Sequence, residues 1–456
     1  MRFLIKISFL LLIFSFLLSF SGIAQKPIEI VFTFWGGPEE AKVMPEVAKI
    51  FEKNNPGITV KAMHIPWEDY IAKVSAMLAG GSPPTLGYTM ETIALDWAEK
   101  GELLDILPLI RKDPDPAIKM ENRLPSIAFW FDKKRKTLGT SVAAEVMVIW
   151  YNKEIFDKAG VPYPPTDPTK WTWKKFVETA TKLTVDVNGK HPNEPGFDHS
   201  KVQTFGVAFG NWYMVWFPFI WSNGGDLCDP TGMTPTINKK EAVEGLQALV
   251  DLIYKHKVAP TPAQLGALPA YHIALQTRRV AMVIDGQWSL LELGRLVKAG
   301  QLKLGVAPLP ILKRVVTGVI GNPIGIYTKA VKDRPEVLDA AWKFYKFLNN
   351  SETVLELLRN GLWMPIQKWW YTDPEYIKKW IGDTGIHPPE YKEAVIDYTL
   401  KYAKPVPVYY LRNFDKINDI MYQELSSAFL GKVSVQSACD EIAKKIAPLL
   451  KGRYDR

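Results

Sequence analysis

Segments with strand and helix patterns alternate along this chain, and this alternation constrains its fold more than any other feature. The β-branched and aromatic run 28–34 predicts a strand, and apolar residues recur at helical spacing over 39–54. A second strand at 57–62 and a second helix at 67–78 follow, and the Gly- and Pro-rich residues 80–84 end that helix. The order predicts an α/β fold with mostly parallel sheets flanked by helices, in which ligands bind beyond the carboxyl ends of the strands.

A second block of the same kind begins near Val142. A single hydrophobic core stops growing at roughly 250–300 residues, so a chain of 456 residues should form two lobes. Because no internal repeat or low-complexity linker separates the blocks, we expect several short crossovers between the lobes, a geometry that permits hinge closure. The predicted strands of the second block cover 142–151, 204–209 and 279–284, and its predicted helices cover 173–183, 212–221 and 239–254.

The first 24 residues have the pattern of a signal peptide. Arg2 and Lys6 supply a positive start, residues 7–20 are almost wholly apolar, and Gly22-Ile23-Ala24 fits a small-x-small cleavage site. An uncleaved membrane anchor is the alternative, but the apolar stretch is shorter than the roughly 20 residues that a spanning helix needs. No cysteine follows it that could carry a lipid anchor. We therefore expect cleavage after residue 24 and a periplasmic or extracellular protein that is not lipid-anchored.

The charge of the chain bears on its binding partners, and its cysteines raise the question of a disulfide. The formal net charge is +8, and the basic residues are spread along the chain, so we expect no nucleic-acid partner. Cys228 and Cys439 are the two cysteines. In an oxidising compartment they could form a disulfide, or both could remain free thiols.

The usual catalytic motifs are missing. The sequence contains no nucleophile elbow, no phosphate loop and no His-Glu-x-x-His pair, and its six histidines lack metal-ligand spacing. We therefore predict no catalytic residue, no metal and no cofactor. A pair of acids for glycoside hydrolysis stays possible, because two such carboxylates need only lie roughly 5–9.5 Å apart in space.

Tryptophan is unusually abundant, with 16 residues beside 18 tyrosines and 21 phenylalanines. Trp35, Trp288 and Trp363 adjoin glycine, proline or polar residues at predicted element ends, and Trp212 and Trp216 lie four residues apart in the aromatic helix. An aromatic ring with amide and carboxylate groups around it matches the apolar face and the hydroxyl rim of a sugar. Packing in the core is the alternative, and the spacing of Trp212 and Trp216 fits either.

Taken in order, these residues resemble the extracellular solute-binding proteins of sugar ABC transporters, the group that includes maltose-binding protein. The most specific segments are Trp150 to Gly160, which leads to Trp171-Thr172-Trp173, and Arg279 to Trp288. Supporting segments are 51–58, 223–225 and 308–326. The resemblance covers essentially the whole chain after residue 24.

The resemblance implies a two-lobed periplasmic-binding-protein fold of type II, with the ligand cleft between the lobes. Lobe one would comprise 25–142 and 307–345, and lobe two 143–306 and 346–456. The implied function is that of a monomeric, non-enzymatic component of an ABC importer. It would bind a carbohydrate, a di- or oligosaccharide, by hinge closure and deliver it to the permease subunits in the membrane. A secreted glycoside hydrolase, with Glu145 and Asp285 as its acids, and a lectin without a transporter are the alternatives.

The resemblance also suggests the ligand-binding residues. Glu145 falls where maltose-binding protein has an acidic sugar contact, and Trp288 falls on its stacking residue. Two departures from the family pattern, Pro84-Thr85 in place of Pro-Asp and the lack of an acid near Trp212, leave the sugar unidentified. The full predicted set is Trp35, Trp212, Trp216, Trp288 and Trp363 for stacking, Glu39, Glu91, Glu145, Asp285, Asn322 and Arg412 for hydroxyl groups, and Trp67 and Gly286 beside them.

Overall fold

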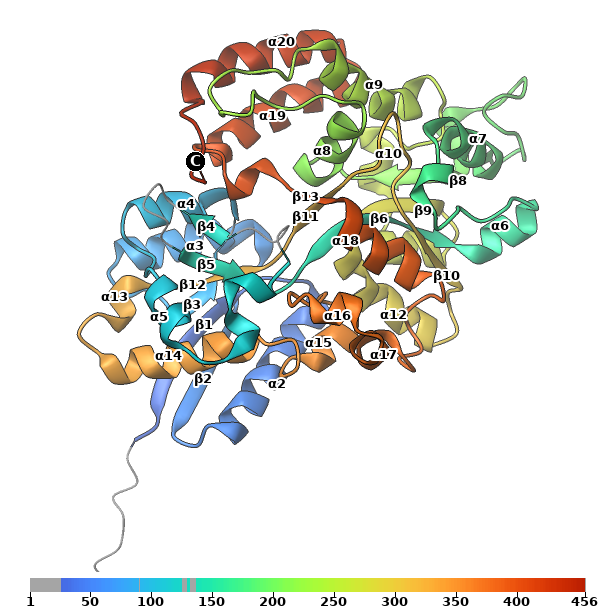
Figure 1. Cartoon of the computed structure of the whole chain (residues 1–456). Helices are drawn as coiled ribbons and strands as arrows, with labels where there is room; N and C mark the ends of the chain where they lie inside the picture. The colour runs from blue at the N-terminus through green and yellow to red at the C-terminus, as the bar shows by residue number, and fades with distance from the viewer. Residues whose placement is uncertain (1–25, 90, 125–128, 132–136, 456) are drawn as a thin grey trace, which may run out of the picture.

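Two β-sheets, each flanked by helices, form two lobes that the chain links at several points (Figure 1). The computed structural model describes residues 26–89, 91–124, 129–131 and 137–455. The predicted signal peptide, residues 1–24, lies outside the described residues. The prediction of a two-lobed α/β fold is confirmed.

Within the described residues, the first sheet has the strand order β2-β1-β3-β12-β5-β4. Strand β1 begins and ends as predicted, and it pairs in parallel with β2 from Ile28 opposite Ile58 to Phe34 opposite His64. Alternation along β1 buries Ile30, Phe32 and Phe34. The strands are β1 (Ile28–Phe34), β2 (Ile58–His64), β3 (Leu86–Tyr88), β12 (Pro323–Ile326), β5 (Thr137–Ser141) and β4 (Phe129–Phe131).

Helix α2 (Pro38–Asn54) leads from the end of β1 back to the start of β2 and shows why the helices of this lobe form. Pro38 stands at its first position, where a missing N–H costs nothing. Met44, Val47 and Phe51 recur at helical spacing and are buried, which fixes the helix against the sheet. The other helices of this lobe are α3 (Trp67–Ala79), α4 (Glu91–Glu99), α5 (Leu107–Lys112), α13 (Thr328–Val331), α14 (Pro335–Leu348) and α15 (Leu355–Arg359).

In the same part of the chain, the second sheet has the strand order β13-β11-β6-β9-β8-β7, with β10 also paired to β6. Every residue of β6 is buried, as expected for a central strand covered on both faces. The strands are β13 (Ala403–Pro405), β11 (Thr317–Ile320), β6 (Glu145–Asn152), β9 (Val280–Gly286), β8 (Val202–Phe209), β7 (Val185–Asp186) and β10 (Leu304–Ala307).

The helices of the second lobe include α8 (Tyr213–Ser222), the predicted aromatic helix, in which every residue is buried. Helices α19 (Phe414–Phe429) and α20 (Val435–Ile446) pack against each other, and α20 also packs against α9 (Lys240–Tyr254) (Figure 1). The remaining helices of this lobe are α6 (Lys153–Ala159), α7 (Trp173–Leu183), α10 (Pro262–Ala267), α11 (Tyr271–Gln276), α12 (Leu290–Lys298) and α18 (Tyr398–Tyr402). Helix α17 (Pro374–Ile381) packs against α15 of lobe one and against α16 (Trp369–Thr372).

The sheets are mixed, which corrects the prediction that they are mostly parallel. Strand β1 is parallel to β2 and β3, and β8 is parallel to β9. By contrast, β6 is antiparallel to β9, β10 and β11, and β12 is antiparallel to β3 and β5. The reason is connectivity: strands that leave one lobe for the other need no crossover helix, so they insert in either direction.

Two short segments carry the chain between the sheets and pass close to each other. Residues 142–144 connect β5 to β6, and Gly321-Asn322 connects β11 to β12. The Val142 N–H donates to the Asn322 carbonyl at 2.9 Å. A Cβ at Gly321 would lie 2.0 Å from the Ala143 carbonyl oxygen, so only glycine permits this crossing.

The strand pairings also move the expected boundaries of the lobes. Lobe one was expected to resume at 307, but β11 pairs with β6, so the chain re-enters the first sheet only at Pro323. Lobe two was expected to resume at 346, but the Leu124 N–H donates to the Ile366 carbonyl and the Lys368 N–H to the Asn122 carbonyl, so residues 366–368 still lie against lobe one. The physical reason is that these boundaries depend on long-range pairing, which a local pattern does not contain.

Two further expectations concern the membrane and the cysteines. Among the described residues, no helix has the length and the apolar character needed to cross a bilayer. Cys228 and Cys439 are free thiols, and Cys439 is buried.

Candidate ligand-binding site

A cavity of about 630 Å³ lies between the two lobes. From lobe one it receives the residues that follow β1 and β2, and from lobe two it receives the end of β9 and the start of α8. The carboxyl ends of strands thus face the cavity, as the α/β pattern predicts. The lining residues are Trp35, Gly36, Gly37, Glu40, His64, Pro66, Trp67, Glu68, Glu145, Trp212, Tyr213, Asp285, Trp288, Ile320, Asn322 and Leu362.

Aromatic rings form the wall on the side of lobe one. Trp35 directly follows β1 and meets Trp67 edge to face, with ring centroids 5.2 Å apart. Tyr70 and Tyr88 pack against the same ring at 4.9 and 4.7 Å. Trp35 is held in place by these contacts, whereas Trp67 is 45% exposed and offers a face to a ligand.

A second aromatic pair forms the opposite wall. Trp212 and Trp288 lie edge to face with ring centroids 6.0 Å apart, and Trp212 also packs against Tyr213. Gly286 permits this arrangement, because a Cβ there would lie 2.1 Å from the ring of Trp288. Glycine therefore allows Trp288 to fold back over the end of β9.

Glu40 is the most unusual acid in the cavity wall. It is buried on helix α2, and the Tyr88 hydroxyl donates to its Oε1 at 3.0 Å. Burial raises the pKa of Glu40 to about 8, although the hydrogen bond from Tyr88 opposes that shift. At neutral pH this side chain keeps its proton and can donate a hydrogen bond.

Two other carboxyl groups come from lobe two. Asp285 accepts from Ser289 Oγ at 2.6 Å and from the Gly286 N–H at 2.9 Å, and burial raises its pKa to about 6. Glu145 at the start of β6 is 5% exposed, and Asn322 Nδ2 donates to its Oε1 at 3.4 Å. Met147 pairs with Gly286, so the start of β6 and the end of β9 meet at this cavity.

The comparison with protein families decides the assignment. The sequence model of the family described as bacterial extracellular solute-binding protein matches residues 36–354. This protein belongs to that family. The match includes the cavity residues Trp67, Trp212 and Trp288, so the family resemblance of the sequence is confirmed.

Individual relatives match either nearly the whole chain or about a third of it. A putative binding protein of Brucella abortus (strain 2308) is 22% identical over 89% of both chains. The arabinooligosaccharide-binding protein of Halalkalibacterium halodurans is 32% identical over 33% of this chain and 29% of its own.

Solved structures share the fold. An ABC substrate-binding protein of Listeria monocytogenes in complex with cycloalternan has a TM-score of 0.77 and 27% identity over 92% of this chain and 98% of its own. Maltose-bound MalE3 of T. maritima has a TM-score of 0.74 and 22% identity over 93% of this chain and 100% of its own. The two-lobed fold of this solute-binding protein is therefore shared along almost its full length.

Seven of the thirteen predicted ligand-binding residues line the cavity of this family member. Each of the seven lies at a strand end, a helix start or a crossover. The seven are Trp35, Trp67, Glu145, Trp212, Asp285, Trp288 and Asn322. Gly286, an eighth predicted residue, leaves space for the ring of Trp288.

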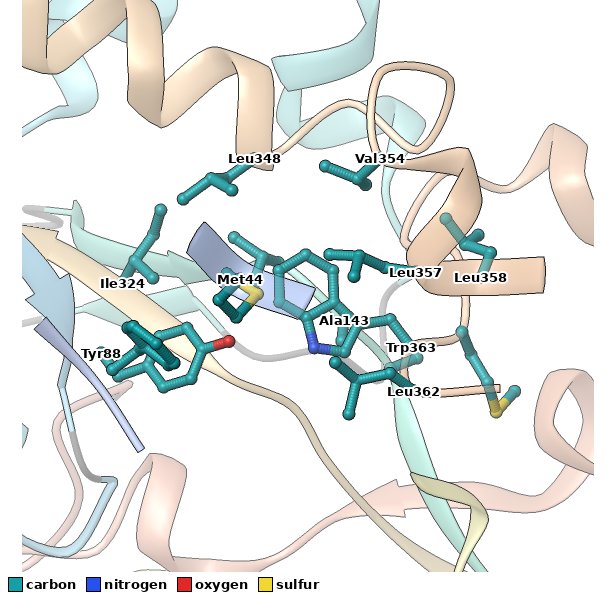
Figure 2. Close-up of a cluster of buried hydrophobic side chains, with 14 of the residues drawn as sticks. Met44, Tyr88, Ala143, Ile324, Leu348, Val354, Leu357, Leu358, Leu362 and Trp363 are labelled. Atoms are coloured by element: carbon teal, nitrogen blue, oxygen red, sulfur yellow. The ribbon is translucent and has the colours of Figure 1, made fainter. Parts of the chain in front are cut away.

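Trp216 and Trp363 are core residues, which corrects their predicted stacking role. The Trp216 ring is fully buried, and its Nε1 donates to Asn211 at 2.9 Å. Trp363 is fully buried beside Met44 and Leu357 (Figure 2). Leu362, the residue before Trp363, lines the cavity where Trp363 was predicted to lie.

Glu39 and Arg412 also lie outside the cavity lining. Glu39 pairs with Lys42 at 2.8 Å and with Arg295 at 3.8 Å. Arg412 pairs with Glu99 and covers the ring of Tyr454. Charged partners of their own thus hold both side chains away from a ligand. The side chain of Glu91 lies outside the described residues.

The sequence analysis missed Glu40, His64, Glu68, Tyr213 and Leu362. For Glu40 a signal was present: it precedes Met44, Val47 and Phe51 on the same helical face, whereas Glu39 lies about 100° away. His64 ends β2, and its Nε2 lies 2.9 Å from the Gly36 carbonyl oxygen. Its position at the carboxyl end of a predicted strand is the one signal that would have suggested His64 as a lining residue.

Proposed function

We propose that this protein is the exported substrate-binding component of an ABC importer and that it binds a carbohydrate, a di- or oligosaccharide. The observation that carries the proposal is the pair of aromatic walls, Trp35 and Trp67 on one lobe and Trp212 and Trp288 on the other, around one cavity. Sugar rings stack on such walls, and carboxyl and amide groups between the walls bond hydroxyl groups. The relatives, which include an arabinooligosaccharide-binding protein and a substrate-binding protein in complex with cycloalternan, support the same class of ligand.

The proposed mechanism is hinge closure. Groups on both lobes contact the ligand, so the ligand stabilises the closed state, and a membrane permease binds that closed surface. The crossover segments at 142–144 and Gly321-Asn322 are placed to act as hinges. We also propose that the mature protein begins after residue 24, has no lipid anchor, acts as a monomer without a cofactor, and binds no nucleic acid.

A thermal-unfolding screen tests the proposal. The mature protein is heated with a panel of mono-, di- and oligosaccharides, and a ligand present at about 100 times its Kd should add roughly 2.7 kcal/mol of stability. Trp288→Ala should abolish the shift, because Trp288 forms one wall of the cavity. Trp369→Ala, at a partly exposed tryptophan outside the cavity, should retain it. Absence of a shift with every saccharide would contradict the proposal, provided that the protein was free of co-purified ligand.

We further propose that the site binds without cleaving. Glu145 and Asp285 are the two candidate acids, and both line the cavity, but the relatives carry the names of binding proteins. Chromatography after prolonged incubation with the bound saccharide should show no product. Turnover that Glu145→Gln abolishes would identify a hydrolase instead. A lectin without closure would keep the same radius of gyration in small-angle scattering with and without sugar.

A further inference from the structure

The described lining of the cavity contains carboxylic acids and no lysine or arginine, and one of these acids, Glu40, keeps its proton at neutral pH. Among the described lining residues, the carboxylic acids are Glu40, Glu68, Glu145 and Asp285, and no lysine or arginine lies beside them. A smaller adjoining cavity of about 220 Å³ shares Glu40 and Asp285 and adds Glu292. A ligand that occupies either space therefore meets carboxyl groups from both lobes.

Hydrogen-bond donors without charge hold these acids in position. Glu40 accepts from a tyrosine hydroxyl, and Asp285 accepts from a serine hydroxyl and a backbone N–H. Beside the smaller cavity, Arg295 pairs with its lining residue Glu292 and with Glu39, both at 3.8 Å. The negative charge of Asp285 thus has no cationic partner within the lining described here.

The cavity is also partly shielded from water. Burial raises the pKa of Glu40 and of Asp285. Burial, together with the neighbouring carboxyl groups of Glu40 and Glu145, also holds the pKa of Tyr88 well above its usual range. Charges interact more strongly where water is excluded. An anionic ligand placed between these acids would have like charges as neighbours, whereas an ammonium group would have carboxylates and the faces of aromatic rings.

We infer that the cavity selects saccharides by charge: it binds neutral and amino saccharides and rejects those that carry a carboxylate, sulfate or phosphate. The inference rests on the proposed function and narrows its ligand class. The rejection follows from the acids that surround the cavity and the lack of a basic residue in its described lining.

Calorimetric titration with matched ligands tests the inference. The probes are maltose, isomaltose and cellobiose, followed by two analogues of the disaccharide that binds best, one with an uronic acid ring and one with an amino sugar ring. We expect the uronic acid analogue to bind at least about 100-fold more weakly than the neutral disaccharide, and the amino analogue to bind at least as tightly. Equal affinity of the neutral and uronic acid forms would overturn the inference and leave the proposed function intact. Lack of binding by saccharides of every charge would overturn both.

Variants of the cavity acids show whether charge or shape causes the rejection of anionic saccharides. Asp285→Asn removes a half-buried acid, and Glu68→Gln removes an exposed one whose loss carries little risk for folding. Each substitution should reduce the ratio of the affinity for the neutral ligand to the affinity for the uronic acid ligand, by at least about tenfold for Asp285→Asn. Glu46→Gln, on the exposed side of α2, is the matched control and should leave the ratio unchanged. A ratio that neither cavity variant alters would mean that shape causes the rejection, which would overturn the inference.

Discussion

Replacing Glu40 by glutamine should change how the stability of this protein depends on pH. Glu40 is buried in helix α2 with the Tyr88 hydroxyl as a donor to its Oε1, and burial raises its pKa from the ordinary 4.5 to about 8. Glutamine has nearly the same shape, offers the same oxygen to Tyr88 and carries no charge at any pH. The substitution therefore removes the titration and keeps the packing.

The sign of the effect follows from proton binding. Between pH 4.5 and about 8 the folded protein keeps the Glu40 proton, whereas the unfolded chain has lost it. The folded state thus binds more protons, so the free energy of unfolding falls as pH rises through that window. Each unit of pKa shift corresponds to about 1.4 kcal/mol, so the loss across the window is roughly 4 to 5 kcal/mol.

Urea unfolding of the ligand-free protein at a series of pH values measures this loss. Subtracting the variant curve from the wild-type curve removes the other titrating groups. Near pH 5 the two proteins should have similar free energies of unfolding, and above about pH 8 Glu40→Gln should be more stable by several kcal/mol. Glu39→Gln is the control. The Glu39 carboxylate lies near the surface and pairs with Lys42, so its removal should change the free energy of unfolding by less than about 1 kcal/mol. Parallel pH profiles for wild type and Glu40→Gln would refute the reasoning.

Three further predictions address the site, the lobe contact and the thiols. Gly286→Ala should weaken saccharide binding about tenfold or more in titration calorimetry, because the new Cβ would lie 2.1 Å from the present Trp288 ring and displace it; unchanged affinity would show that the ring position is not needed. Arg412→Met should leave saccharide affinity within about fivefold, because Arg412 pairs with Glu99 outside the cavity; a loss as large as that of Trp288→Ala would restore its predicted role as a ligand contact. Cys228 and Cys439 should both react with a thiol reagent in denaturant without reductant and react slowly in the native protein, because burial raises the pKa of each thiol to about 12; no reactive thiol in denaturant would indicate a disulfide.

Much of the local structure could be predicted from the sequence. The strand at 28–34 and the helix at 173–183 begin and end where their patterns predict, because each pattern reports burial on one face. Trp35, Asp285 and Trp288, which the sequence suggests as ligand contacts, line the cavity, since the ends of strands converge on one edge of a sheet. The order of the sequence motifs along the chain was enough to identify the family.

The direction of the strands and the limits of the lobes required the tertiary structure. Strand β11 follows a second-lobe strand along the chain and precedes a first-lobe strand, and its own residues carry no signal for either sheet. Pairing between β11 and β6 joins residues more than 170 positions apart. A local pattern reports which residues are buried but not which partner buries them.

The role of each tryptophan and acid was decided in the same way. Sequence determined that this protein would have abundant aromatic rings at element ends and two lobes to hold them. Only the fold decided that Trp288 lines the cavity while Trp363 packs beside Met44, and that Glu40 enters the wall while Glu39 pairs with Lys42. An indole ring stabilises a core and a sugar site by the same burial of apolar surface, so its chemistry is identical in both, and only the neighbours brought together by long-range packing distinguish them.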